Sequence, residues 1–402
     1  MEKIVVVGAG QAGASCVAKL RAEGFKGSIT LIGEEPVPPY QRPPLSKGYL
    51  LGEMSLDRLF LRPESYYEEQ DIDLRLSTRV EAIDRAAQTV RAGGVDIPYD
   101  ALVLTTGSTP RRIPETLGGN LKGVHVVRDL ADVDAMAPEA VEGARALIVG
   151  GGYIGLEAAA VCRKKGMDVT LIEMADRILQ RVAAPETSDY FRKLHRDQGV
   201  TIREGVGLTC LEGVDGRLTG AILSDHSEHP YDVAIVGIGI EPGLALAEAA
   251  GLEIDNGIKV DAHGRTSDPA IWAAGDCASL PYRGERIRLE SVQNAIDQAE
   301  AVAKNILGAA EDYVPMPWFW SDQYDVKLQI AGLNTGYDKV VVRDGGAARS
   351  HWYYAGDTLL AVDAMNDPRG YMVGKRLIEA GKSPLSDAVA DTGTDLKGLL
   401  RA

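Results

Sequence analysis

The feature that most constrains this fold is a glycine-rich loop of the pattern Gly-x-Gly-x-x-Gly, which occurs twice. The first copy begins at Gly8 and the second at Gly150, and these residue numbers differ by 142. Each copy follows a predicted buried parallel strand, at residues 4–7, which are all apolar, and at residues 145–149, where Arg145 precedes four apolar residues. Each also opens a segment with a helical pattern, and a second short strand comes next. The sequence therefore predicts two Rossmann-type β-turn-α-β units.

The loops have the composition that dinucleotide binding requires. The first glycine permits the tight turn, the second lets the backbone approach a pyrophosphate, and the third lets helix and strand pack closely. The pyrophosphate then rests on the helix N-terminus, where free N–H groups and the helix dipole favour negative charge. Because both copies occur in this strand–helix context, each predicts a dinucleotide site.

An acidic residue after the second strand of each unit bears on which nucleotide binds. In the first unit the candidate is Glu34, with Glu35 next in line, and in the second it is Glu173. A carboxylate there accepts hydrogen bonds from a ribose 2′-hydroxyl and repels a 2′-phosphate, so we expect the second site to prefer NADH to NADPH. Arg177 is the alternative contact for a 2′-phosphate, although we expect it to be a surface side chain.

A third motif indicates that one of the two nucleotides is a flavin. Residues 266–276 form an apolar strand that ends in Gly275-Asp276, which would place a carboxylate at the polyol chain of a cofactor. Two dinucleotide sites in one chain are typical of a resident flavin and a diffusing nicotinamide. We therefore expect FAD at the first site and NADH at the second.

We expect an α/β fold with two Rossmann-type dinucleotide-binding domains plus a C-terminal α+β domain. The FAD-binding domain is predicted to be discontinuous, with its first part at residues 1–108 and its second at 240–309. The NAD-binding domain is predicted at 109–239, between those parts. The C-terminal domain is predicted at 310–402, where an aromatic cluster precedes four strand-like runs and a helix.

Charge and composition exclude several classes of partner and cofactor. The net charge of −15 disfavours nucleic acid and anionic membrane surfaces. No apolar run approaches the roughly 20 residues needed to cross a bilayer. The four cysteines are scattered and the six histidines lack metal-ligand spacing, so we expect no metal and a cytoplasmic location.

These motifs resemble the two-dinucleotide flavoprotein family related to glutathione reductase. The resemblance rests on both glycine loops, on Thr105-Thr106-Gly107 and on residues 268–278. Three further stretches are similar to the NADH:ferredoxin reductases of oxygenase systems, the putidaredoxin reductase-like enzymes. Those stretches are residues 42–47, 290–295 and 317–324, and the resemblance spans nearly the whole chain.

The resemblance implies which residues form each site. The residues implied to line FAD are Gly8, Gly10, Ala12, Gly13, Glu34, Arg42, Lys47, Val80, Thr106, Gly107, Arg128, Asp276 and Val292. Those implied to line NADH are Gly150, Gly152, Tyr153, Ile154, Gly155, Glu173 and Gly239. It also implies that Lys47 lies beside flavin N5 and pairs with Glu157, and we expect Trp320 to be the aromatic nearest the flavin and the exit surface. A cation there would stabilise the anionic reduced flavin.

The absence of a thiol indicates how electrons leave. Disulfide reductases of this superfamily need a Cys-x₄-Cys pair beside the flavin, and NADH peroxidases and oxidases need one cysteine in the loop after the first acid. Residues 36–51 contain none. We therefore expect single-electron transfer to a 2Fe–2S ferredoxin that serves an oxygenase, by a monomer or homodimer. The alternatives are an NADH oxidase, a rubredoxin reductase, or a binding flavoprotein like apoptosis-inducing factor.

An acidic ferredoxin would need a local basic surface on this acidic chain. The candidate positions are Arg58 and Arg62, then Arg283, Arg286 and Arg288, and in the third domain Arg369, Lys375, Arg376 and Lys382. Related reductases can carry a basic residue near Glu300, where this chain is acidic. Rim charges determine partner choice, so this departure bears on which ferredoxin binds.

Overall fold

The structure is a computed structural model that describes residues 1–401. The chain forms two compact units, and each is interleaved in sequence with the other. The first unit comprises residues 1–42, 55–109 and 240–317, and the second comprises residues 43–54, 110–239 and 318–402.

The first unit is built on a five-stranded parallel sheet with the order β19-β7-β1-β2-β3. Its strands are β1 (Lys3–Val7), β2 (Ser28–Ile32), β3 (Ile72–Arg75), β7 (Ala101–Leu104) and β19 (Ile271–Ala273). Side chains alternate between the two faces of β1 because successive strand residues point in opposite directions. Ile4 and Val6 face one core cluster, and Val5 and Val7 face another.

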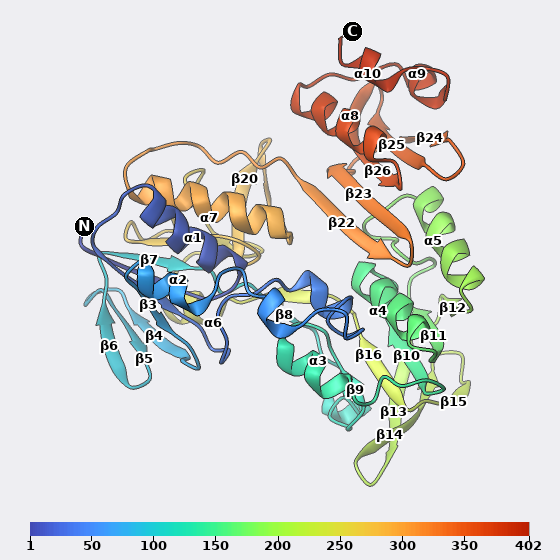
Figure 1. Ribbon diagram of the computed structural model, residues 1–402, viewed down its shortest axis with the longest axis horizontal. Helices are drawn as coiled ribbons and strands as arrows, with labels where there is room; N and C mark the ends of the chain where they lie inside the picture. The colour runs from blue at the N-terminus through green and yellow to red at the C-terminus, as the bar shows by residue number, and fades with distance from the viewer. Residues whose placement is uncertain (402) are drawn as a thin grey trace. The chain divides into compact units, whose positions relative to one another are not determined.

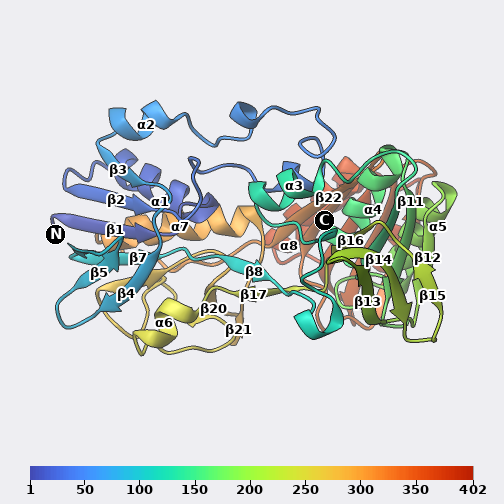
Figure 2. The same cartoon turned by 90° about the horizontal axis from the view of Figure 1, so that it is seen from below.

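Helices cover one face of this sheet and further strands cover the other. Helices α1 (Gln11–Ala22) and α7 (Val292–Ile306) lie side by side on the first face (Figure 1). The second face packs against β4 (Val80–Asp84), β5 (Thr89–Ala92), β6 (Val95–Pro98), α6 (Ala245–Ala249), β18 (Ile258–Lys259) and β20 (Ala278–Tyr282). Figure 2 labels β4, β5, α6 and β20 among them. The unit thus has the three layers that a buried parallel sheet requires.

The second unit contains another parallel sheet, with the order β12-β11-β10-β16-β9. Its strands are β9 (Val124–His125), β10 (Arg145–Val149), β11 (Asp168–Glu173), β12 (Thr201–Glu204) and β16 (Val233–Val236), and its helices are α3 (Leu130–Met136), α4 (Tyr153–Lys164) and α5 (Pro185–Asp197). The hairpin of β13 (Leu208–Val214) and β14 (Arg217–Leu223) packs on one face.

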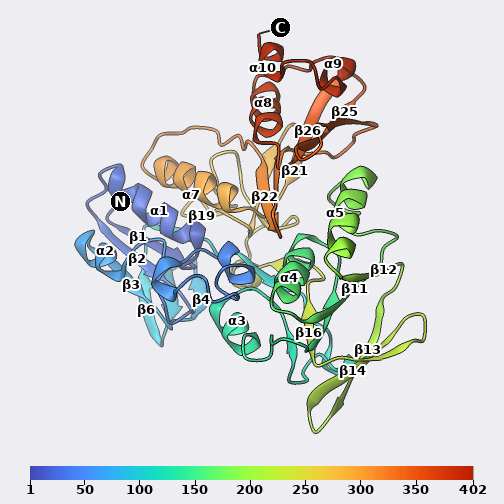
Figure 3. The ribbon, with the colours of Figure 1, turned by 45° about the vertical axis from the view of Figure 1, so that its right-hand side comes forward.

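The C-terminal residues of the second unit form an antiparallel sheet with the order β22-β23-β26-β25-β24. Its strands are β22 (Trp318–Gln323), β23 (Val326–Gly332), β24 (Lys339–Asp344), β25 (Arg349–Ala355) and β26 (Thr358–Met365), and helix α8 (Pro368–Glu379) packs on β26 and β23. The aromatic cluster at residues 318–320 is therefore the first strand of this sheet. Strand β22 lies next to α4 (Figure 3).

The polar tail beyond Pro384 has structure that the sequence did not predict. Helices α9 (Ser386–Ala390) and α10 (Leu396–Leu399) each bury one apolar side chain, Val389 and Leu396. Within residues 1–401, no helix is both long and apolar enough to span a membrane.

Candidate functional site

The first glycine loop joins β1 to α1 in the first unit, and its glycines have different roles. A Cβ atom on Gly8 would lie 2.2 Å from the Thr105 carbonyl oxygen, and one on Gly13 would lie 2.0 Å from the Gly8 carbonyl oxygen. A Cβ on Gly10 would meet no atom within 4 Å. The protein itself therefore requires the first and third glycines, whereas the second faces open space.

The second loop repeats this arrangement in the second unit. A Cβ on Gly150 would lie 2.3 Å from the Gly237 carbonyl oxygen, and one on Gly155 would lie 2.0 Å from the Gly150 carbonyl oxygen, but Gly152 again faces open space. Neither α1 nor α4 has a side-chain cap at its N-terminus. Both loops therefore offer free N–H groups beside room for a pyrophosphate, which fits the FAD and NADH that the sequence predicts.

The carboxylate of Glu173 lies at the end of β11, where the dinucleotide ribose is predicted. Its Oε2 accepts from the Gly151 backbone N–H at 2.7 Å, and its Oε1 accepts from the Ala175 N–H at 2.8 Å. Two backbone donors hold the carboxylate in one position beside the glycine loop. This geometry supports Glu173 as the ribose acid of the second unit.

The first unit differs from the second at the corresponding position. Val7 pairs with Ile32 in the first unit and Val149 pairs with Ile172 in the second. Gly33 therefore occupies the position in the first unit that Glu173 occupies in the second. Glu34 lies one residue further and makes an exposed ion pair with Arg79, with an N–O distance of 3.1 Å. Such a pair is weak enough to yield to a ligand.

Glu35, the second acidic candidate of the first unit, already has partners. It accepts hydrogen bonds from the Tyr40 hydroxyl and the Arg42 guanidinium. These contacts commit Glu35 to the loop that carries Arg42. Of the two acids, Glu34 is therefore the better placed for a ribose.

Arg177 is not the surface side chain that we expected. Its guanidinium donates to the Ser188 hydroxyl, to the Ala183 carbonyl at 2.8 Å and to the Gln180 carbonyl at 3.4 Å. The side chain is half-buried because it bridges the loop after β11 to helix α5. It is thus committed to protein contacts and is poorly placed to bind a 2′-phosphate.

Asp276 follows β19 at the same edge of the first sheet as the glycine loop. The Ser108 hydroxyl donates to its Oδ2 at 2.9 Å, and the preceding Gly275 N–H donates to Gln298 Oε1 at 2.9 Å. A Cβ on Gly275 would lie 3.1 Å from the Cβ of Ala12 in the glycine loop. Gly275 is therefore in contact with the first glycine loop, and the placement of Asp276 at the polyol chain of the flavin stays a prediction.

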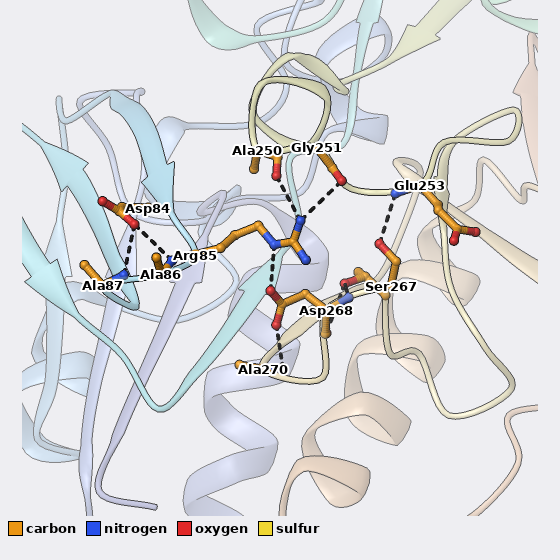
Figure 4. A network of polar contacts seen from close by, with 11 residues as sticks. Asp84, Arg85, Ala86, Ala87, Ala250, Gly251, Glu253, Ser267, Asp268 and Ala270 are labelled. Atoms are coloured by element: carbon orange, nitrogen blue, oxygen red, sulfur yellow. Dashed lines mark hydrogen bonds and ion pairs between the residues drawn. The ribbon is translucent and has the colours of Figure 1, made fainter.

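The strand that leads to Asp276 is anchored at its other end by Arg85 (Figure 4). The Arg85 Nε donates to Asp268 Oδ2 at 2.7 Å, and its Nη1 donates to the carbonyls of Ala250 and Gly251, each at 3.3 Å. These contacts join the two sequence-distant parts of the first unit. They fix where β19 begins and hence where Asp276 lies.

The residues predicted to line FAD are divided between the two units. Gly8, Gly10, Ala12, Gly13, Glu34, Arg42, Val80, Thr106, Gly107, Asp276 and Val292 belong to the first unit, and Lys47 and Arg128 belong to the second. Val292 is the first residue of α7, and the Thr106 hydroxyl donates to the Gly243 carbonyl at 2.6 Å.

Lys47 and Glu157 form the ion pair that the resemblance implied. Lys47 Nζ lies 2.8 Å from Glu157 Oε2, and the Glu157 side chain is almost fully buried whereas that of Lys47 is 20% exposed. The Ser46 hydroxyl donates to the same oxygen at 3.1 Å, and the Ser321 hydroxyl donates to Oε1 at 2.7 Å. Sequence reasoning missed both serines, because hydroxyl groups carry no recognisable spacing signal.

Strand β22 presents different chemistry on its two faces. Trp318 and Trp320 share one face, where their rings are 5.5 Å apart and Lys375 Nζ lies 5.5 Å from the Trp318 ring centroid. Phe319 points to the opposite face and lies 5.0 Å from the Tyr153 ring. The two predicted residues, Trp320 and Tyr153, are thus on opposite sides of one strand.

Three of the four cysteines are too buried for thiol chemistry. Cys16, Cys162 and Cys277 are buried, and burial raises the pKa of the Cys16 and Cys162 thiols to about 12. None of the described cysteines is in a disulfide, and residues 1–401 contain no cluster of acids, histidines and cysteines that could hold a metal ion.

The candidate docking surfaces differ in how far their basic side chains are exposed and in how many contacts these side chains make with the protein. Arg286 donates to the Val260 and Ser279 carbonyls, and Arg288 donates to the Asn256 carbonyl and pairs with Glu290. By contrast, α8 exposes Arg369 and Arg376 on one face with Met372 between them, since these positions share a helical stripe. This stripe is therefore more accessible than Arg286 and Arg288.

Comparisons with known proteins show which families this chain resembles. Residues 2–299 match the pyridine nucleotide-disulphide oxidoreductase family, and residues 318–400 match the reductase C-terminal family. A ferredoxin--NAD(P)(+) reductase of Sphingomonas sp is 45% identical over 99% of this chain and 97% of its own length. Rhodocoxin reductase of Rhodococcus erythropolis is 42% identical over 98% of this chain and 93% of its own. The reductase in the covalent putidaredoxin reductase-putidaredoxin complex is 38% identical with a TM-score of 0.96, covering 100% of this chain and 98% of that one.

Proposed function

This chain belongs to the pyridine nucleotide-disulphide oxidoreductase family, and from that membership we infer that it is an FAD-dependent NADH:ferredoxin reductase. Its partner is a ferredoxin, and we propose one of the 2Fe–2S type that serves an oxygenase. The observation that carries the proposal is the pairing of two dinucleotide loops with a segment, residues 36–51, that contains no cysteine. Without a thiol to take two electrons together, a one-electron protein acceptor is the fitting outlet.

The residues divide the work between nucleotide binding and electron exit. Bound FAD supplies the conversion of a hydride into single electrons. The Glu173 carboxylate selects the ribose of NADH, and the Lys47 ammonium, held by Glu157, provides a fixed positive charge. Trp320, on the face of β22 that also carries Trp318 and Lys375, is proposed to mark the exit toward ferredoxin.

We place the ferredoxin on the exposed stripe of α8, which carries Arg369 and Arg376. A rim of positive charge attracts an acidic partner even though the whole chain is acidic, because exposed charges act over roughly 8 Å at physiological ionic strength. A cytoplasmic location accompanies this proposal, in keeping with the four scattered cysteines of the sequence.

Ferredoxin-dependent NADH oxidation tests the proposal directly. Purified protein is mixed with NADH and a panel of 2Fe–2S ferredoxins, and reduction of the iron–sulfur centre is followed by its absorbance. We expect turnover with at least one ferredoxin and little oxygen consumption without it. Equal NADH consumption with oxygen alone would indicate an NADH oxidase instead, and slow reduction with a long-lived nicotinamide complex would indicate a binding flavoprotein.

A further inference from the structure

A chain of buried hydrogen bonds continues from the Lys47–Glu157 pair into the protein. The Gln323 side-chain amide donates to the Ser321 oxygen at 3.2 Å, and its carbonyl oxygen lies 2.8 Å from His195 Nε2. The Tyr324 hydroxyl lies 3.3 Å from His195 Nδ1. Together with the Ser321–Glu157 contact, these bonds lead from Tyr324 to the carboxylate that holds Lys47.

This series of hydrogen bonds forms because the residue spacings along strand β22 and helix α4 match where the two elements pack together. Phe319, Ser321 and Gln323 alternate along β22 and share the face toward the NAD-binding helices. Tyr153 and Glu157 are one turn apart on α4, a spacing of about 6 Å that two strand residues also cover. Phe319 therefore meets Tyr153, and Ser321 meets Glu157. Gln323 continues the series to His195 on α5.

The chemistry of the groups fixes the direction of every bond in the chain. An ionised Glu157 can only accept, so the Ser321 hydroxyl donates its one proton to it. Ser321 must then accept from the NH₂ of Gln323, which turns the amide oxygen toward His195. His195 therefore carries its proton on Nε2, and its Nδ1 accepts from Tyr324. All donors point toward Glu157.

The burial of these hydrogen-bonded groups indicates a role beyond packing. Ser321, Gln323, His195 and Glu157 are each at most 2% exposed. Buried polar groups destabilise a core unless they are fully paired, and apolar side chains of the same size would pack as well. Burial also lowers the pKa of His195 to about 4, so the imidazole is neutral at physiological pH. The hydrogen-bonded groups thus point their dipoles at the Glu157 carboxylate, and the neutral His195 adds no charge that would compete with Lys47.

We propose that Gln323 and His195 are positioning residues for the reaction, because they hold the Ser321 hydroxyl in the orientation that donates to Glu157. Glu157 is then fixed to accept from Lys47, and the Lys47 ammonium is held in one place. This inference rests on the proposed function, in which Lys47 acts on the reduced flavin. Strand β22, the first strand of the C-terminal domain, then supports hydride acceptance by the flavin as well as electron exit.

A second buried chain between the same helix and the same sheet offers a matched control. The Thr187 hydroxyl, also on α5, lies 2.8 Å from Asp363 Oδ2 and 2.7 Å from His351 Nδ1. Arg349 Nε donates to His351 Nε2 at 3.0 Å. The side chains of Thr187, His351 and Asp363 are as buried as those of the first series, and their hydrogen bonds do not lead to Glu157. A variant there reports the general effect of weakening the contact between α5 and the sheet.

The test uses the FAD-loaded enzyme and stopped-flow reduction by saturating NADH. Gln323→Met keeps the volume and removes both polar atoms, whereas Gln323→Glu keeps the acceptor for His195 and removes the donor to Ser321. We expect both to slow flavin reduction about three- to tenfold, the range for one lost hydrogen bond, with an unchanged KM for ferredoxin. The flavin reduction potential should fall in the same variants, because the reduced anion loses a well-placed cation. Thr187→Val should leave both quantities unchanged.

A second pair of variants at His195 keeps the inference testable if the Gln323 variants do not fold. His195→Gln can retain a donor toward Gln323 and should preserve the reduction rate, whereas His195→Leu should slow it like Gln323→Met. Normal reduction rates in folded, FAD-loaded His195→Leu and Gln323→Glu would overturn the inference, as would equal slowing by Thr187→Val. If the wild-type protein itself binds no FAD or reduces no ferredoxin, the proposed function fails instead.

Discussion

We expect a preference for NADH over NADPH, and its size follows from the contacts of Glu173. Backbone N–H groups of Gly151 and Ala175 hold its two oxygens, so the carboxylate cannot swing away from a ribose. A 2′-phosphate in place of the 2′-hydroxyl loses a hydrogen bond to a charged group, which contributes about 1.5–3 kcal/mol. It also adds like-charge repulsion of at least about 1 kcal/mol per unit charge at 4 Å, even in bulk water.

Together these effects predict a large discrimination between the two nucleotides. Their lower limits sum to about 2.5 kcal/mol, which corresponds to roughly 70-fold in kcat/KM. Glu173→Ala removes the repulsion and leaves the Gly151 and Ala175 N–H groups free to donate to a phosphate. We expect this variant to gain about tenfold in kcat/KM for NADPH and to lose about tenfold for NADH.

Steady-state reduction of ferricyanide with each nucleotide measures both changes without a ferredoxin. Arg177→Met is the control, since the guanidinium is engaged by Ser188, Ala183 and Gln180 and should not affect the ratio of the two efficiencies. Equal wild-type efficiency with NADH and NADPH would refute the reasoning. So would a selective loss of NADPH turnover in Arg177→Met, which would show that this guanidinium reaches the nucleotide.

Three further outcomes are expected. The purified protein should be yellow and release FAD rather than FMN on denaturation, as absorbance and chromatography would show; colourless protein that FAD cannot reconstitute would contradict both glycine-loop assignments. Removing Lys47 or Glu157 should slow flavin reduction by NADH, whereas reversing Arg369, Lys375 and Arg376 to acids should spare it and raise the KM for ferredoxin, an effect that shrinks with salt; an unchanged KM at low salt would place the docking site elsewhere. Burial lowers the pKa of His351 to about 4, so the unfolded chain binds more protons than the folded one between about pH 4 and 6.5, and stability falls as pH falls through that window. His351→Asn should reduce the loss of thermal stability between pH 7 and pH 5 by about 2 kcal/mol, and an unchanged slope in thermal scans would show that His351 is not buried neutral.

The sequence was sufficient for the parts of the fold whose residues carry local signals. The strand at residues 145–149 lies where predicted, because an apolar run that leads into a glycine turn leaves few alternatives. The two Rossmann-type units and the C-terminal α+β domain are confirmed. Strand β22 was not predicted as a strand, because its three consecutive aromatic residues conceal the alternation between its faces.

The polar contacts could not be predicted, because they join residues far apart in the chain. Ser321 reaches Glu157 across 164 positions, and Gln323 reaches His195 across 128. Nothing near these residues in sequence distinguishes a hydroxyl that orients a carboxylate from one that faces solvent. The contacts of Arg177 could not be predicted for a related reason, since two of its three acceptors are backbone carbonyls.

The two glycine loops show how far one motif determines function. Both have the same steric pattern, in which a Cβ on the first or third glycine would collide with backbone atoms and one on the second would meet none. They differ at the end of the next strand, where the second unit has Glu173 and the first unit has Gly33 at the equivalent position. A Cβ at Gly33 would lie 2.5 Å from the Cβ of Ala9, so no acid can occupy that position in the first unit, and Glu34 must approach a ribose from one residue further. We therefore expect the same pyrophosphate loop to hold two different dinucleotides, because the residue at the end of the second strand, and not the glycines, differs between the two units.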